Sequence, residues 1–405
     1  MRKSFSSIGL IGGAFIISAQ APAPAPDALT LIQAQVRPIV RDPAGGPSGA
    51  AWEMLVADAA GAQFVIVGEQ HGSGDIARLE AALHRELARR GFTHSALEVG
   101  PYSTAFAERL IRSGKGKLQS YIATPGHGFT LPFLAYAEEA EMAEAMVASS
   151  PDEKQALFGL DQEFVGAGPI LAAELGTLAR TAAQRKAVDA FAGASAKERL
   201  LVAKVDETEL RPLEIAFASD RKALDMIEAM RTSARIYMPF LSGKGSGYAA
   251  NLERETYMKR NFVRQFEAAA KHNGKAPKVF FKFGGNHAMR GFSDTNVPAL
   301  ANFIAEWGVP RGYRLVNLMV DCIGGQATSA DGTIAPCESY LGPESLIRRS
   351  VEAGPARQIV DLRPLRKMLS RAKFDDASRK VILAFDYYVA VKDGAGATRV
   401  GNPAQ

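Results

Sequence analysis

One stretch decides how the rest of this chain is expected to fold: Phe64-Val65-Ile66-Val67-Gly68-Glu69-Gln70-His71-Gly72. A short, β-branched apolar run that ends on a glycine predicts a buried strand of a parallel sheet. Ligands of open α/β sheets bind beyond the carboxyl ends of the strands, which is where Glu69 and His71 stand. Residues two apart point to the same face of an extended strand, so both side chains could converge on one ligand. The alternative is a strand that ends in ordinary polar loop residues.

The flanking segments predict alternating helices and strands. Gly72-Ser73-Gly74-Asp75 predicts a turn with an N-cap, and residues 76–90 carry apolar side chains at helical spacing up to Gly91. Further helices are predicted at 50–59, 101–112 and 131–146. Further strands are predicted at 95–99, 155–160, 278–283, 313–320 and 381–391.

Residues 168–271 are almost wholly helical in pattern. The helices are predicted near Ile170–Ala190, Ala196–Val205, Arg211–Arg231 and Ala249–Ala270. We interpret them as a helical insertion beside the active-site edge of the sheet, with a separate small domain as the alternative. The chain is therefore predicted to have an α/β fold, a mainly parallel sheet flanked by helices, whose core is formed by residues 50–167 and 272–405.

Polar side chains collect at the ends of four predicted strands. They are Glu69 and His71, then Glu98, then Asp161 and Glu163, and finally Lys282, Asn286 and His287. Because the carboxyl ends of parallel strands share one edge of the sheet, we expect these residues to form one site. A histidine oriented by a carboxylate can take a proton from water, and Arg78 or Lys282, or amides after Gly72, could stabilise an oxyanion. No Gly-x-Ser-x-Gly elbow occurs, which favours direct attack by water over an acyl-enzyme.

Length and charge narrow the class of protein. The 405 residues, 47% hydrophobic, can form one large α/β domain or two smaller ones. The net charge of +5 falls to +3 (5 − 2) if Arg2 and Lys3 are cleaved off, which is too weak for a nucleic-acid partner. A signal peptide is predicted over residues 1–21, with cleavage near Ala21. The evidence is the basic start, the apolar residues 8–19 and the motif Ala19-Gln20-Ala21. We expect a periplasmic or secreted protein without stable membrane insertion, beginning with a Pro/Ala-rich linker and loop at 22–49.

The two cysteines, Cys322 and Cys337, flank a loop rich in Gly, Ala and Asp. In an oxidising compartment they predict a disulfide that closes this loop and stabilises the fold by about 3 kcal/mol. Their spacing matches neither a zinc knuckle nor a CxxC redox pair.

Several motifs together resemble a known family. Gly68-Glu69-Gln70-His71-Gly72-Ser73, the helix up to Gly91-Phe92, and Ala96-Leu97-Glu98 look like the start of the erythromycin esterases. That family shares a superfamily with ChaN-like haem-binding proteins and Tiki metalloproteases. Gly284-Gly285-Asn286-His287-Ala288 resembles its second histidine motif, and Ala384-Phe385-Asp386-Tyr387-Tyr388 its closing strand.

The resemblance implies a set of catalytic roles. They are His71 as the base that activates water, Glu69 and Glu98 as orienting carboxylates, His287 as the second imidazole, and Arg78 as the active-site arginine. One residue separates Glu69 from His71, whereas the esterases usually place two there, and this shorter spacing is closer to the ChaN-like and Tiki branches. We therefore predict hydrolysis of an ester or amide, without assigning a macrolide substrate.

Metal and haem binding remain open alternatives. His71, His287, Glu69 and Glu98 form a set of N and O ligands suited to zinc, manganese or iron. For haem, the resemblance to ChaN-like proteins makes an axial His or Tyr relevant, with Tyr102, Tyr121 and His127 as candidates. The expected partner is accordingly a small-molecule substrate or haem.

The remaining polar residues are assigned by context. The candidates for substrate binding are Asp161, Lys282, Asn286, Arg290 and His127. The residues predicted to be solvated or to cap elements are His84, His94 and His272. An acidic helix face, also predicted to be solvated, comprises Glu138, Glu139, Glu141 and Glu144.

Overall fold

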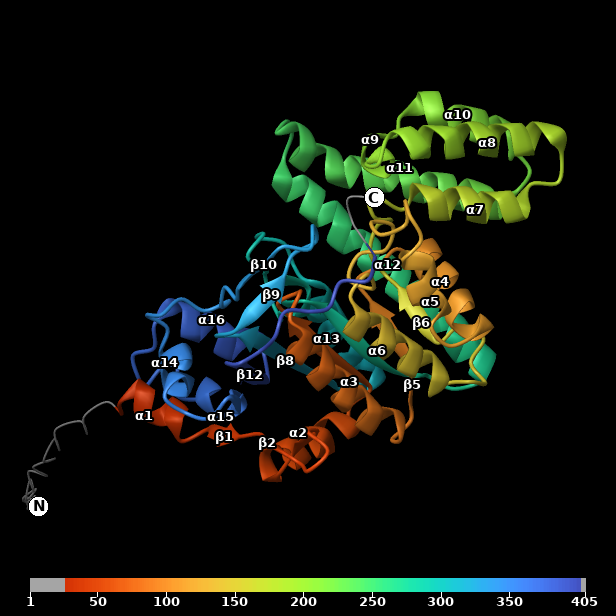
Figure 1. Ribbon diagram of the computed structural model, residues 1–405. Coiled ribbons are helices and arrows are strands. Elements are labelled where there is room, and N and C mark those ends of the chain that lie inside the picture. The colour runs from red at the N-terminus through yellow and green to blue at the C-terminus, as the bar shows by residue number, and fades with distance from the viewer. Residues whose placement is uncertain (1–25, 402–405) are drawn as a thin grey trace, which may run out of the picture.

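The computed structural model describes residues 26–401, so the predicted signal peptide, residues 1–21, lies outside the described residues. Its strands are β1 (Val36–Pro38), β2 (Val40–Arg41), β3 (Pro47–Ser48), β4 (Phe64–Glu69), β5 (Phe92–Leu97), β6 (Leu157–Gly159), β7 (Lys278–Gly284), β8 (Leu315–Cys322), β9 (Gln326–Thr328), β10 (Ile334–Pro336), β11 (Arg357–Asp361) and β12 (Tyr387–Val391). Eight of them form a central sheet in the order β1-β11-β12-β8-β4-β7-β5-β6 (Figure 1). The six strands from β12 to β6 are parallel, and β1 and β11 add antiparallel pairs at one edge. The predicted α/β fold with a mainly parallel sheet is confirmed.

Helices cover both faces of this sheet. They are α1 (Ala28–Gln33), α2 (Ala50–Ala60), α3 (Gly74–Ala88), α4 (Pro101–Ser113), α5 (Lys117–Ile122), α6 (Ala137–Ala148), α7 (Gly168–Leu178), α8 (Ala182–Lys197), α9 (Leu201–Lys204), α10 (Glu207–Ala216), α11 (Arg221–Ser242), α12 (Gly247–Asn273), α13 (Leu300–Gly308), α14 (Leu346–Glu352), α15 (Arg363–Arg366) and α16 (Asp376–Ala384), with the short 3₁₀ turns η1 (Gly285–Ala288) and η2 (Val309–Arg311). No helix within residues 26–401 is long and apolar enough to cross a membrane.

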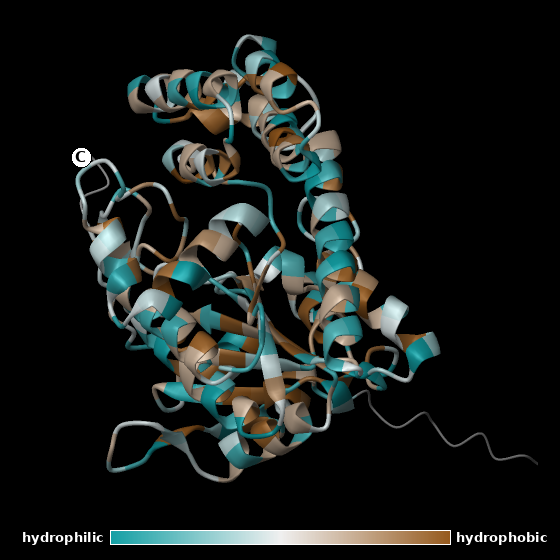
Figure 2. Ribbon diagram, turned by 90° about the vertical axis from the view of Figure 1, so that its right-hand side faces the viewer, coloured by the Kyte–Doolittle hydropathy of each residue, from teal (hydrophilic) through white to brown (hydrophobic). Residues whose placement is uncertain are grey.

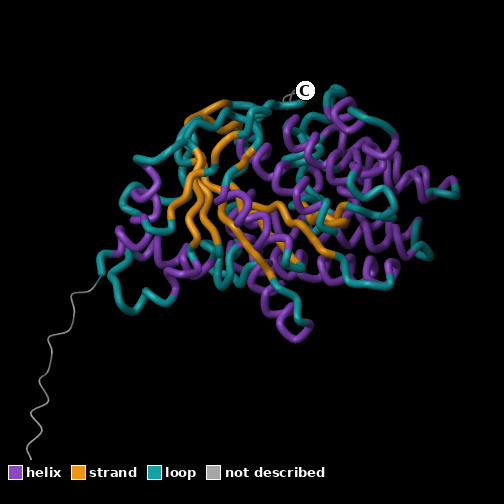
Figure 3. Tube along the Cα trace, turned by 90° about the horizontal axis from the view of Figure 1, so that it is seen from below, coloured by secondary structure: helices purple, strands orange, loops and turns teal. Residues whose placement is uncertain are grey.

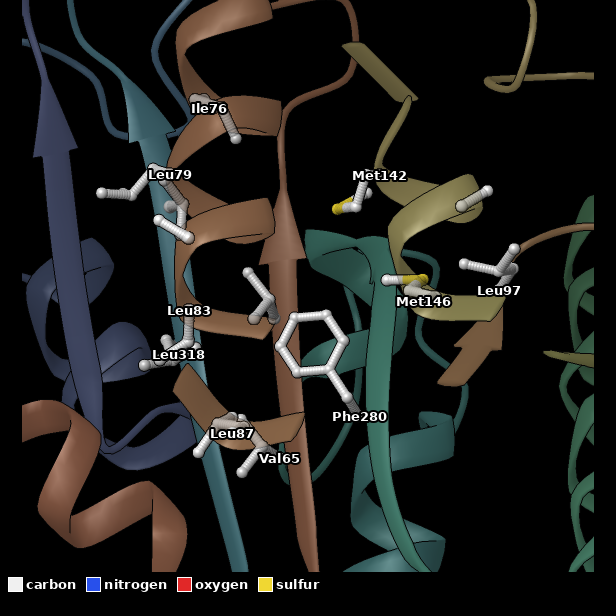
Figure 4. Packing of buried hydrophobic residues seen from close by; sticks show 14 of the residues in the cluster. Val65, Ile76, Leu79, Leu83, Leu87, Leu97, Met142, Met146, Phe280 and Leu318 are labelled. Atoms are coloured by element: carbon white, nitrogen blue, oxygen red, sulfur yellow. The ribbon is translucent and has the colours of Figure 1, made fainter. Parts of the chain in front are cut away.

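The strand β4 lies at the centre of the sheet, between β7 and β8, and is buried along its whole length. Its alternate side chains enter two cores: Val65 and Val67 face α3 and α6, whereas Phe64 and Ile66 face α12 and α13. The predicted helix after the first strand is confirmed as α3, whose apolar stripe packs over Val65 and neighbouring strands (Figure 4). The packing of α3 against β4 fixes the position of Glu69 at the end of the strand.

Two of the predicted elements are wrong at their N-terminal ends. The predicted strand at 381–391 is a strand only from Tyr387, because Asp375 caps the helix α16 that runs to Ala384. The predicted helix at 131–146 begins only at Ala137, since residues 131–136 form turns in which Phe133 has a positive φ of 60°.

Between β6 and β7 the described chain contains only helices, α7 to α12, which project from one side of the sheet (Figures 1 and 3). The first four, with α11, enclose a small apolar core of their own, and α12 runs back along the sheet (Figure 2). The single helix predicted at 170–190 is two helices, because Thr181 and Gln184 form a capping box that begins α8. Whether these helices are an insertion or a separate domain stays a prediction.

Four side chains are buried although the glutamates were predicted to be solvated and the histidines to be solvated or to cap elements. His84 and His94 are each 2% exposed, on α3 and β5 respectively. On α6, Glu138 and Glu139 are also buried, because they lie on the stripe of the helix that faces α3 and the sheet. The prediction of a solvated acidic face is therefore wrong for these two glutamates.

Candidate active site

The predicted strand ends do meet at one edge of the sheet. Glu69 ends β4, Glu98 follows β5, Asp161 follows β6, and His287 lies in η1 directly after β7. They line a cavity of about 760 Å³, called here the site cavity, together with His71 and Arg254. The parallel order β4-β7-β5-β6 explains the convergence, because neighbouring strands carry their following loops to the same side.

His71 is held by a buried carboxylate on one side and an aromatic ring on the other. Its Nδ1 lies 2.7 Å from Glu69 Oε1, and its ring stacks on Phe133 with centroids 4.0 Å apart. Burial raises the pKa of Glu69, but Lys282 and His71 outweigh it, so the pKa lies below its usual range. The ionised Glu69 accepts a hydrogen bond from Nδ1–H, and in the neutral imidazole this places the lone pair on Nε2. That Nε2 atom lies 3.6 Å from Glu98 Oε2 in the site cavity.

His287 has the same arrangement with different partners. Its Nδ1 lies 2.7 Å from Glu255 Oε1, and its Nε2 lies 3.4 Å from Glu98 Oε1. Burial and the charge of Arg254 lower its pKa, but Glu98 and Glu255 outweigh them and raise the pKa to about 9. His287 is therefore an imidazolium at neutral pH.

Glu98 stands between the two imidazoles. Oε1 accepts a hydrogen bond from Arg254 at 2.7 Å, and Oε2 accepts one from the backbone N–H of Gly284 at 2.6 Å. Although burial opposes ionisation, His287, His71 and Arg254 hold the pKa of Glu98 well below its usual range. A side chain at Gly284 would place its Cβ only 2.9 Å from His71 Nε2, so glycine keeps the centre of the site open.

The loop that carries His71 is fixed by two distant segments. The carbonyl of Gly72 accepts hydrogen bonds from the amides of Thr328 and Ala397, each at 2.8 Å. Gly72 has a φ of 89°, and a Cβ there would lie 2.2 Å from the Thr328 carbonyl oxygen, so only glycine fits. The predicted disulfide Cys322–Cys337 is present and closes the β9–β10 segment, which forms one wall of the site cavity.

The other polar residues predicted at these strand ends divide into two groups. Asp161 and Asn286 line the site cavity, and Asp161 accepts two hydrogen bonds from Arg254, at 2.9 and 2.6 Å. Lys282 is buried beneath the cavity and donates to Glu69 rather than facing a ligand. Glu163 is also buried and binds the amides of Tyr102 and Ser103 at the start of α4.

Three further predicted residues do not reach the site cavity. Arg78 is half exposed and pairs with Glu138 at 2.9 Å. Arg290 pairs with Asp386 at 2.7 Å. His127 lines a separate cavity of about 620 Å³ beside α7 and α8.

The site does not fit a metal ion well, and the tyrosines considered for haem lie outside it. Within residues 26–401, no three His, Cys, Asp or Glu side chains are arranged to hold a metal ion. Arg254, bound to Glu98 Oε1, places a positive charge beside the carboxylate that faces both imidazoles. The haem candidates Tyr102 and Tyr121 do not line the site cavity, and Tyr121 stacks on His127 with ring centroids 4.2 Å apart.

Sequence reasoning missed Arg254, Glu255 and Phe133. Arg254 and Glu255 come from α12, far along the chain from the strand ends. The signal for Glu255 is a charge on an otherwise apolar stripe, three residues before Met258 and seven before Phe262. Phe133 carried no signal, because its place against His71 depends on a turn with positive φ.

Comparison with known proteins gives the fold. No family model and no curated protein matches the sequence. A succinoglycan biosynthesis protein of known structure has a TM-score of 0.64 at 15% identity, covering 91% of this chain and 97% of the other. A Bacillus cereus protein gives 0.59 at 15% identity, covering 92% and 98%. A mutant erythromycin esterase in its open conformation gives 0.58 at 17% identity, covering 85% and 93%. The resemblance inferred from the motifs is thus supported at the level of structure: the chain has the fold of erythromycin esterase.

Proposed function

We propose that this protein is a hydrolase that cleaves an ester or amide with water activated by His71. The observation that carries the proposal is the pair of imidazoles whose Nδ1 atoms each lie 2.7 Å from a buried carboxylate and whose Nε2 atoms meet at Glu98. Orienting a histidine by a carboxylate on Nδ1 is the arrangement that prepares Nε2 for proton transfer. A cavity of about 760 Å³ leaves room for substrate above this pair.

The surroundings of the two histidines assign their roles. His71, with its Nε2 lone pair turned to the cavity, takes a proton from water as that water attacks the carbonyl carbon. His287, already cationic, donates a hydrogen bond to the developing oxyanion or a proton to the leaving group. The ionised Glu98 holds His287 protonated, and Arg254 keeps Glu98 in place.

The lining of the site cavity disfavours an anionic substrate. Beyond the histidines, Glu69, Glu98, Asp161 and Arg254, the charged lining residue is Glu338. The remaining walls carry aromatic rings, prolines and neutral amides and hydroxyls, which offer stacking and hydrogen bonds. Export through a signal peptide cleaved near Ala21 is part of the proposal, and the disulfide supports it because such bonds persist in oxidising compartments.

A substrate panel tests the proposal. Mature protein, purified from the periplasm without added metal or chelator, is assayed against neutral and charged esters and amides. We expect turnover of neutral substrates that EDTA does not abolish. Elemental analysis and a visible spectrum of the same sample test the alternatives. A Soret band with stoichiometric iron would favour haem binding, and about one zinc or manganese per chain, lost with activity in EDTA, would favour a metal-dependent hydrolase.

The pH dependence should report His287. Its pKa is raised from 6.5 to about 9, so the cation is present below that value and is lost as the pH rises through it. We therefore expect kcat to fall about tenfold per pH unit above pH 9, measured on a stable neutral ester. In His287→Gln this alkaline limb should disappear and kcat should be low throughout. An unchanged alkaline limb in the variant would exclude His287 as the acid.

A further inference from the structure

Four ionisable side chains form a closed group beneath the site cavity: Glu69, Glu80, Glu139 and Lys282, called here the buried quartet. They come from β4, α3, α6 and β7, and each side chain is 5% exposed or less. Lys282 lies two residues from the fully buried Phe280 on the same face of β7, so it occupies a position in the apolar layer beneath α3 and α6. A charge in such a layer is strongly unfavourable unless it is paired.

Lys282 lies within ion-pair distance of the other three members of the quartet. Its ammonium donates to Glu69 Oε1, lies 2.8 Å from Glu139 Oε1, and lies 3.8 Å from Glu80 Oε2. Burial lowers its pKa, but the three carboxyl groups outweigh burial and keep the pKa well above its usual value. The same Glu69 Oε1 atom also faces His71 Nδ1. One oxygen is therefore held between the ammonium and the imidazole.

The two remaining carboxyl groups differ in state. Neither oxygen of Glu80 has a hydrogen-bond partner in the described part of the chain. Burial, reinforced by Glu69 and Glu139, raises the pKa of Glu80 well above its usual range, so this carboxyl is neutral. Glu139 is bound to Lys282, and burial raises its pKa to about 7. Above neutral pH, Glu139 carries the second negative charge of the quartet.

We propose that Lys282 and Glu139 are positioning residues for the hydrolysis proposed above, in which Lys282 fixes Glu69 as an ionised acceptor behind His71 and Glu139 holds Lys282 in place. This inference rests on the proposed function and deepens it. Neither residue lines the site cavity, so both act through Glu69. Glu80 fills the quartet as a neutral group and does not share this role.

The charges around the quartet determine how each substitution should change the surroundings of Glu69. The groups that face Glu139 are Lys282 on β7, Glu69 on β4, Glu80 on α3, His71 in its loop, and Tyr136 before α6. Removing the charge of Glu139 takes away one of the carboxylates that hold the ammonium of Lys282. Removing Lys282 leaves Glu69 buried without its cation, so that Glu69 takes up a proton or turns away.

The test compares two isosteric variants, Glu139→Gln and Glu80→Gln, with Lys282→Met. At about pH 8, Glu139→Gln should lower kcat about 10-fold, whereas Glu80→Gln should change kcat less than about twofold, because that carboxyl is already neutral. Below pH 7 the effect of Glu139→Gln should diminish, because Glu139 itself takes up a proton there. Lys282→Met should lower kcat about 10- to 100-fold and change KM less than about threefold. Circular dichroism and thermal unfolding identify any variant that fails to fold.

An infrared measurement separates this inference from the proposed function. At about pH 8 the wild type and Glu139→Gln should show the carbonyl stretch of a protonated carboxyl, and Glu80→Gln should lack it. Equal losses of kcat in both glutamine variants at about pH 8, or no loss in Glu139→Gln, would overturn the positioning role. A missing carboxyl band in an active enzyme would overturn the charge assignment alone. A wild type that hydrolyses nothing would overturn the proposed function, and with it the positioning role.

Discussion

The variant His71→Ala is expected to lose about 10³-fold in kcat on a neutral ester, because general-base catalysis contributes between about 10² and 10⁴. His71 is the imidazole whose Nδ1 is bound to an ionised Glu69 and whose Nε2 faces the site cavity. Its side chain is 32% exposed, so truncation should leave the core intact. Steady-state kcat and KM on the purified variant, with a circular dichroism spectrum, measure the effect.

The matched control is His272→Ala. His272 lies at the exposed end of α12, away from the site cavity, and its loss should leave kcat unchanged. The comparison separates loss of the base from general effects of removing an imidazole. If His71→Ala kept more than a tenth of the wild-type kcat, His71 would not be the base, and a mechanism through Glu98 would have to be considered.

The strand ends were predictable because they depend on local pattern and topology. The apolar run at 64–67 predicts a buried parallel strand, and in such a sheet the following residues must meet at one edge. That reasoning correctly brought together Glu69, Glu98, Asp161 and His287. It also placed Lys282 at the ligand. Alternation along β7 instead puts the lysine on the same buried face as Phe280, where it binds Glu69.

The partners of these residues were not predictable in the same way. Arg254 reaches Glu98 across 156 residues of sequence, and no local pattern specifies that contact. What the sequence does contain is a set of charges on otherwise apolar helical stripes: Glu80 between Ile76 and Leu83 on α3, and Glu139 beside Met142 on α6. A charge in such a position must find a partner when the helix packs. Those positions indicate the two members of the buried quartet that come from helices, Glu80 and Glu139, although not the geometry of the group.

Replacing Arg254 by methionine is expected to lower the free energy of unfolding by about 3–5 kcal/mol, because it leaves two buried carboxylates without their shared cation. Arg254 is the only described side chain that binds both Glu98 and Asp161, at 2.7 Å and at 2.9 and 2.6 Å. It also ties α12 to the strand ends of β5 and β6, so its loss should loosen the helices from the sheet. Urea unfolding followed by circular dichroism gives the value.

A double-mutant cycle distinguishes lost charge pairing from lost packing. Asp161→Asn removes one of the two carboxylates, so adding it to Arg254→Met should recover about 1–3 kcal/mol relative to the sum of the single variants. The matched control is Arg235→Met, since Arg235 is 47% exposed and its ion pairs with Glu228 and Glu253 lie on the surface, where such pairs contribute about 0–1 kcal/mol. Strictly additive effects would mean that Arg254 stabilises the fold through its packed stem, and that Glu98 keeps its ionised state through His287 and the Gly284 amide alone.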